Sequence, residues 1–249
     1  MTRPAPPSAL VGVDPAAPRP ALGFRLDVPD EYTVLDLDPA TSDASLERLL
    51  DERGAAVVGA ARQRVRGRQV LRQVVADHRK AGVFLAAYLA GAGASPGEIV
   101  GAGLTLAWRR FAGGVDLDAL AAFFQENDPQ PGEDRAPTDV LRVRLPCGEA
   151  VRVVNRQLAP VPLTSRGREV VVVQHLVPVP QPASDWLAVL TASTPDVEGA
   201  RDFIDFAGRV VWTLEFLDGE GRPVSEAGRA GTGQPSVTTS TATARRATS

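Results

Sequence analysis

The sequence predicts an α+β fold in which helices pack on a mainly antiparallel β-sheet. Three observations indicate this fold class. The stretch from residue 168 to residue 218 contains two strand patterns, a helix pattern and a closing strand in succession. Two nearly continuous apolar runs, 83–89 and 99–108, follow one another with only a Gly-rich connection between them. Strands and helices do not alternate regularly along the chain, as they would in a parallel α/β sheet.

The N-terminal part of the domain begins with two short strand patterns. Residues 24–28 and 32–37 alternate apolar and polar side chains on either side of a Pro-Asp pair, which predicts an opening hairpin. Cap-forming residues at 38–43 precede a long helical pattern that continues almost to the first apolar run. Because the apolar face of this pattern shifts along its length, we expect a kink or break near Gly67.

The middle of the chain combines the central strands with a helix and a hairpin. The two apolar runs suit strands that are covered on at least one face. Residues 115–124 predict a short helix, and the polar, Pro-containing stretch 125–138 predicts a surface loop. Strand patterns at 140–145 and 151–156 flank a Pro-Cys-Gly turn, which predicts a second hairpin.

The C-terminal part contains the clearest pattern. Strands are predicted at 170–177 and 186–193, joined by a proline-rich connector. Residues 196–214 place apolar side chains at intervals of three and four, which predicts a helix with one apolar stripe. The pattern then changes to period two over 212–216, which predicts an edge strand.

Composition sets the domain boundaries. The Pro- and Ala-rich segment 1–21 and the Ser- and Thr-rich segment 219–249 contain few large apolar side chains, so we expect both to be disordered tails. Residues 22–218 then form a single α+β domain with a sizeable core.

Charge and cysteine content limit the classes of partner and site. The net charge of −3 gives no overall attraction to nucleic acid or anionic lipid. Cys147 is the single cysteine, which excludes an intrachain disulfide and a paired-cysteine metal site. The N-terminus lacks the apolar core of a signal peptide, and no window approaches the roughly 18 apolar residues of a membrane span. We expect a cytoplasmic protein without membrane insertion.

Four segments carry a resemblance to a known fold group: 24–29, 32–37, 174–180 and 187–195. In their order and spacing, the chain resembles the PsbP-like fold group and, within it, actinobacterial proteins related to the envelope lipoprotein LpqN. The resemblance implies a PsbP-like α+β domain over most of residues 22–217. Relatives of this fold are binding or assembly proteins, which implies a non-enzymatic role. The chain departs from the lipoproteins, since it shows neither an export signal nor a lipid-bearing cysteine near its start.

The candidate chemical residues all have structural interpretations. His175 in a strand and His78 on a helix are possible general bases, but neither has an assignable Ser or Cys partner, so structural or surface roles are favoured. Cys147 lies in a turn with no basic neighbour to lower its pKa, which favours an inert thiol. The pairs Asp36/Asp38 and Asp116/Asp118 favour capping and solvation over a hard-cation site. We predict no catalytic residue, no metal site and no cofactor.

Two segments contain candidate binding residues. A basic run on the long helix favours a solvated face first, protein contact second and nucleic acid last. The proline-rich connector before Trp186 either prevents edge pairing or forms a preorganised contact surface, and the structural role is favoured. The candidates are Arg64, Arg68, Arg72, Pro178, Pro180 and Trp186.

The function hypothesis follows from the resemblance and the missing catalytic pattern. The leading hypothesis is a non-enzymatic, cytoplasmic protein-binding or accessory domain, linked to a secretion or envelope-associated system. The alternative is a small-molecule binding protein or a hydrolase that uses a cleft between sheet and helices, with His175 as its base. A concave polar pocket that contains the imidazole would favour this alternative, whereas a His175 that is buried and surrounded by apolar side chains would exclude it. Nucleic-acid binding through the basic run would require steep salt dependence.

Overall fold

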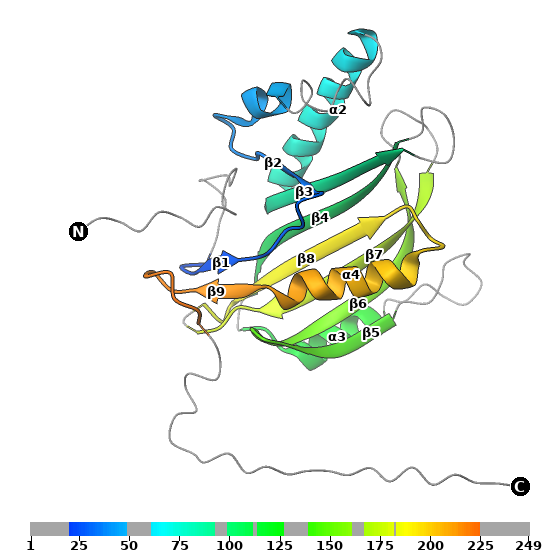
Figure 1. The fold of residues 1–249 in the computed structure, drawn as a ribbon. Coiled ribbons are helices and arrows are strands. Elements are labelled where there is room, and N and C mark those ends of the chain that lie inside the picture. Colours follow the sequence, from blue (N-terminus) through cyan, green and yellow to red (C-terminus); the bar gives the residue numbers. More distant parts are fainter. Residues whose placement is uncertain are drawn as a thin grey trace, which may run out of the picture.

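The computed structural model describes residues 20–48, 61–92, 99–111, 114–126, 139–160, 167–181 and 183–224. It confirms the α+β class. In the described residues, seven strands form one fully antiparallel sheet in the order β2-β3-β4-β8-β7-β6-β5, and a separate two-stranded sheet pairs β1 with β9 (Figure 1).

The large sheet consists of β2 (Thr33–Leu35), β3 (Val83–Ala92), β4 (Ile99–Arg110), β5 (Asp139–Leu145), β6 (Gly148–Pro160), β7 (Gly167–Pro178) and β8 (Trp186–Thr194). The small sheet consists of β1 (Gly23–Arg25) and β9 (Glu215–Leu217). The helices are residues 42–48, α2 (Ala61–Lys80), α3 (Leu117–Glu126) and α4 (Ala200–Trp212). The predicted central strands, second hairpin and 115–124 helix are thereby confirmed.

One face of the sheet packs against α4. Leu106 lies opposite Leu190 in the register of β4 and β8, and both are fully buried. Ala207, Val210 and Val211 of α4 are buried in the same cluster. Apolar residues at this helical spacing place one stripe of α4 on the sheet, and their burial supplies most of the stability of this layer.

The opposite face carries α2 and α3. The next pair in the same register, Ala107 and Val189, points away from α4 because side chains alternate along a strand. Ala107 packs in a cluster with Val75 of α2, and Val189 packs in a cluster with Phe124 of α3. The sheet therefore has helices on both faces. Among the described residues, α4 covers one face, and α2 and α3 cover the other (Figure 1).

The predicted opening hairpin is wrong. The tight turn exists, since the backbone N–H of Tyr32 donates to Pro29 O at 2.9 Å. However, β1 pairs with β9, and β2 pairs with β3. Phe24 lies opposite Phe216 in the small sheet. Both aromatic rings are buried in the apolar cluster between the sheet and α4, called the α4 core below. This burial favours pairing with the C-terminal strand over pairing with the nearest strand in sequence.

The predicted break near Gly67 is also wrong, because α2 runs unbroken from Ala61 to Lys80. Among the described side chains of α2, that of Val75 is buried, whereas that of Val65 is 58% exposed.

The last helix begins later and ends earlier than 196–214. Asp196 forms a turn before it, in which its carboxylate accepts the backbone N–H of Gly199 at 2.9 Å. The helix then runs from Ala200 to Trp212, so Trp212 belongs to the helix and not to the closing strand. Most of the predicted 125–138 loop and most of both predicted tails lie outside the described residues.

Candidate binding groove beside helix α4

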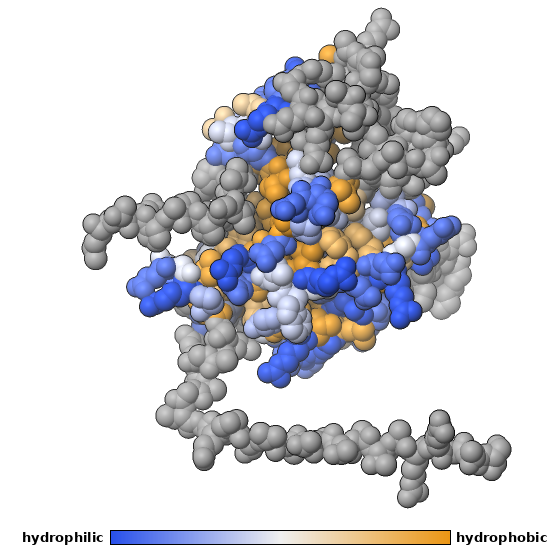
Figure 2. Space-filling model, in the orientation of Figure 1, coloured by the Kyte–Doolittle hydropathy of each residue, from blue (hydrophilic) through white to orange (hydrophobic). Residues whose placement is uncertain are grey.

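A groove of about 540 Å³ lies between α4 and strands β5, β6 and β7. Apolar residues appear on both sides of the polar outer surface of α4 (Figure 2). The residues that line the groove are Val143, Arg144, Leu145, Arg152, His175, Ile204, Asp205, Gly208, Arg209, Val211 and Trp212.

The helical wall of the groove comes from Ile204, Gly208 and Val211, which follow the i, i+4, i+7 spacing of one helix face. Gly208 lies in the interior of α4, where glycine is less favourable than alanine by about 0.5–1 kcal/mol. A Cβ atom at this position would meet no heavy atom within 4 Å. The missing side chain therefore widens the groove at its centre.

The rim of the groove is formed by the α4 residues that come one position after the wall residues in the sequence. Asp205, Arg209 and Trp212 share the i, i+4, i+7 spacing and are all exposed. Trp212 is 57% exposed even though it is the largest apolar side chain of the helix. Exposed Trp and Arg side chains are enriched where protein partners bind.

His175 and Arg152 form the floor. They lie directly opposite each other on β7 and β6, on the face that carries α4. His175 is 2% exposed, and its Nδ1 atom is buried without a hydrogen-bond partner. The Nε atom of Arg152 is also buried without a partner, although its Nη2 atom lies 3.2 Å from the Asp139 carboxylate. Such unpaired buried groups are costly, so they need an explanation.

The environment keeps the imidazole neutral. Burial, together with the neighbouring Arg152 guanidinium, lowers the pKa of His175 to about 4. At neutral pH, the charged side chains on the α4 side of the groove are then Arg152, Arg209 and Asp205. Arg144 alternates with Val143 and Leu145 and shares the opposite face of the sheet with Glu149. The groove therefore combines two arginines and one carboxylate with an apolar wall and an exposed indole.

Strand β5 adds an open backbone edge next to this groove. It is the last strand in the sheet order and pairs with β6 on one side. Among the described residues, no strand pairs with its other side. Leu141 is 45% exposed on this strand, and Arg142 forms ion pairs with Asp118 and Glu149. An unpaired strand edge can accept a further strand from another chain.

The predicted basic residues have a structural role where their side chains are described. Arg68 pairs with Glu47, and Arg72 donates two hydrogen bonds to Asp43 at 2.8 and 3.1 Å. These contacts join α2 to the helix at 42–48. The side chain of Arg64 lies outside the described part of the chain. None of these residues lines the α4 groove.

The proline-rich connector closes the β7–β8 hairpin. The backbone N–H of Val179 donates to Trp186 O at 2.9 Å, and the N–H of Ala183 donates to Pro180 O at 3.0 Å. Pro178 is the last residue of β7, and the guanidinium of Arg110 lies 5.9 Å from the centre of the Trp186 ring. Pro178, Pro180 and Trp186 do not line the groove, and a contact role for them stays a prediction.

His78 joins α2 to the sheet. Its Nε2 atom shares a hydrogen bond with the Tyr88 hydroxyl of β3. Burial lowers the pKa of His78, which the nearby Asp77 carboxylate partly offsets. Burial also raises the pKa of Tyr88 to about 12, so both groups are neutral at pH 7. The contact explains His78 as a helix–sheet link.

The remaining candidate residues lie in turns. Cys147 is 6% exposed in the β5–β6 turn and packs in the α4 core, so the exposure that would make a turn thiol reactive is not present. Asp116 accepts the backbone N–H groups of Asp118 and Ala119 at the start of α3. Asp36 accepts the N–H of Asp38 at 3.0 Å. These contacts are the turn and capping contacts expected from the sequence.

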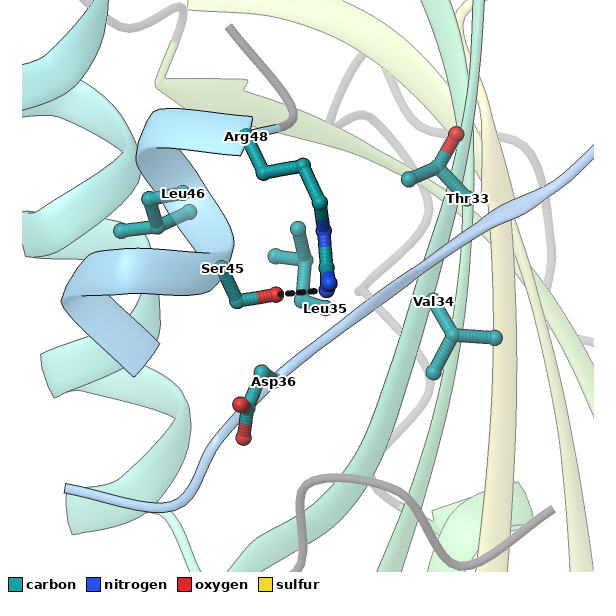
Figure 3. Close-up of a pocket in the computed structure, with 7 residues that line it drawn as sticks. All are labelled: Thr33, Val34, Leu35, Asp36, Ser45, Leu46 and Arg48. Atoms are coloured by element: carbon teal, nitrogen blue, oxygen red, sulfur yellow. Dashed lines mark hydrogen bonds between the residues drawn. The ribbon is translucent and has the colours of Figure 1, made fainter. Parts of the chain in front are cut away.

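A second, smaller hollow of about 210 Å³ lies between β2 and the helix at 42–48. Arg48 extends into it and donates to Ser45 Oγ at 3.4 Å, whereas Val34 points to the other side of the strand (Figure 3). Thr33 Oγ1 is buried there without a partner.

Within the described ranges, no three His, Cys, Asp or Glu side chains gather closely enough to hold a metal ion. None of the helices in this part of the chain is long and apolar enough to cross a membrane.

Comparisons with known proteins find similarity at the level of solved structures. No protein-family model and no curated protein matches the sequence. Among solved structures, the chain is similar to LpqN of Mycobacterium tuberculosis, a protein described as involved in cell envelope biogenesis. The two chains are 12% identical, the similarity covers 78% of this chain and 83% of that chain, and the TM-score is 0.42. The fold is therefore assigned from its own strand order and register, and membership of the PsbP-like group stays a prediction.

Of the residues that line the groove, His175 is the one that the sequence indicates as a candidate. Residue 212 belongs to both the predicted helix 196–214 and the predicted strand 212–216, so the sequence does not assign Trp212 to the helix face of Asp205 and Arg209. A glycine inside a strong helical pattern was the available signal, because such a glycine often has a packing or functional reason. The sequence around Arg152 does not indicate a binding role, because His175, which faces it across the sheet, is distant in sequence.

Proposed function

We propose that the chain is a non-enzymatic binding domain and that a segment of a partner protein lies in the α4 groove. The observation that carries this proposal is the groove itself, which combines an apolar helical wall, an exposed Trp212 and an excess of arginine. Aromatic and Arg side chains provide most of the binding energy in protein interfaces. An extended segment in the groove would also reach the open edge of β5, where backbone hydrogen bonds are available.

The alternative is a small-molecule binding protein or hydrolase that uses the same groove. The groove does contain the His175 imidazole and charged side chains, as that hypothesis requires. The described lining includes no Ser, Thr or Cys for the imidazole to activate, so the observations favour binding over nucleophilic catalysis. A place in a secretion or envelope-associated system is the setting that the sequence resemblance predicts.

Affinity capture from a cell extract with a blocked groove tests the proposal. Gly208→Trp should fill the groove, because there is open space at this position. Gly219→Trp is the matched control, since Gly219 lies in a turn after β9 and also has no heavy atom within 4 Å of an added Cβ. We expect one protein to be captured by the wild type and by Gly219→Trp, and to be lost with Gly208→Trp.

Equal capture by both variants would contradict the proposal. Circular dichroism and thermal unfolding of the two variants would show that each is folded. A small molecule that co-purifies with the wild type, in place of a protein, would favour the alternative.

A further inference from the structure

Two facing residues at the floor of the groove, Arg152 and His175, each have a buried nitrogen atom without a hydrogen-bond partner. Arg152 Nε–H is a donor in every protonation state of the protein. His175 Nδ1 becomes a donor in one of the two neutral tautomers. The two residues face each other across β6 and β7, where opposite Cβ atoms lie about 5 Å apart. Both atoms are buried, and neither has a partner.

We infer that this floor binds one carboxylate group, supplied by an Asp or Glu side chain of the partner segment, through Arg152 and His175. The inference rests on the proposed function and names the chemistry that the groove recognises. A carboxylate oxygen accepts several hydrogen bonds, so one oxygen can satisfy both nitrogens. The nitrogens are closed to water before binding, so a side-chain rotation at the floor accompanies entry of the ligand.

The charge balance favours a carboxylate over a doubly charged phosphate. The Asp139 carboxylate already offsets part of the Arg152 charge. His175 is neutral, and Asp205 on the rim repels additional negative charge. Arg209 supplies the remaining positive charge around the opening. The two arginines and the two carboxylates balance, so a singly charged carboxylate adds less unfavourable charge than a doubly charged phosphate does.

Gly208 and the apolar wall fit the same occupant. A peptide segment that places its carboxylate on the floor would run between Ile204 and Trp212, past the gap left by Gly208. Its apolar side chains would then contact the wall while the carboxylate is held below. This arrangement distinguishes an acidic segment with apolar neighbours from a purely polar acidic tail.

A nuclear magnetic resonance titration tests the inference directly. The full-length protein, labelled with ¹⁵N, is titrated at pH 7 and constant ionic strength with acetate and with the neutral isostere acetamide. We expect acetate to shift the His175 ring nitrogens and Arg152 Nε with a saturable curve, and acetamide to leave them unchanged. Arg152→Gln should weaken acetate binding at least tenfold, on the order of the loss of one charge-assisted hydrogen bond. The control Arg72→Gln lies outside the groove and should bind as the wild type does.

Three results would overturn the inference: no saturable shift with acetate, equal shifts with acetamide, or unchanged affinity in Arg152→Gln. Inorganic phosphate that saturates the same resonances at lower concentration than acetate would replace carboxylate by phosphate as the ligand. If acetate fails while partner capture is still lost with Gly208→Trp, the carboxylate site is wrong and the binding domain stands. If capture is insensitive to Gly208→Trp, the proposed function itself is wrong.

Discussion

The buried His175 makes stability depend on pH in a direction that can be worked out from its surroundings. The pKa of this imidazole falls from 6.5 in the unfolded chain to about 4 in the folded protein. Between these values the unfolded state binds a proton that the folded state does not bind. Stability is therefore fully present above pH 6.5 and is lost as the pH falls toward 4. At 1.36 kcal/mol per pH unit, the full difference corresponds to about 3 kcal/mol.

Urea unfolding of the wild type and His175→Leu at pH 7.5, 6.0 and 4.5 measures this effect. We expect the free energy of unfolding of the wild type to fall by about 2–3 kcal/mol more than that of the variant between pH 7.5 and pH 4.5. The pKa values of His78 and Asp218 are also lowered, but both groups are present in both proteins and cancel in the difference. Parallel pH profiles would refute the reasoning, because they would place His175 in contact with water in the folded state.

Three further substitutions test other parts of the structure. Gly208→Ala should raise the free energy of unfolding by about 0.5–1 kcal/mol, because the added methyl meets open space; calorimetry that shows a lower Tm would contradict this placement. Leu190→Ala should cost about 2–5 kcal/mol in urea unfolding, since Leu190 is fully buried, and a loss below about 1 kcal/mol would place it outside the core. Arg72→Ala should change stability by at most about 1 kcal/mol, because the Arg72 and Asp43 side chains are 49% and 67% exposed; a larger loss would show that this link does more than join two exposed helices.

The fold class could be predicted because most of the strands are long and carry strong local patterns. Strands β7 and β8 and the apolar stripe of α4 are visible in single windows of sequence. Partner choice is not visible in such windows. β1 pairs with β9 across nearly the whole domain, because Phe24 and Phe216 bury their rings in one core. The turn at residues 29–32 predicts a hairpin of the two opening strands. The structure contains this turn, but the two strands pair with other strands.

The binding groove was less predictable for the same physical reason. His175 was visible as an unusual residue in an apolar strand, but Arg152 faces it only through the register of β6 and β7. Trp212 lies on the rim because it is the last residue of α4 and not the first residue of the closing strand. The predicted candidates Arg68 and Arg72 instead hold two helices together, because acidic residues that precede α2 lie close in space.

Site-specific photo-crosslinking measures most directly whether a partner lies in the α4 groove. A benzophenone side chain is placed at Trp212 in one protein and at Phe123 in another, and each is irradiated in the presence of the captured partner. The two positions are matched, since both are aromatic and 57% exposed, but they lie on helices that cover opposite faces of the sheet. We expect a crosslink to the partner from position 212 and none from position 123. A crosslink from position 123 without one from position 212 would contradict it.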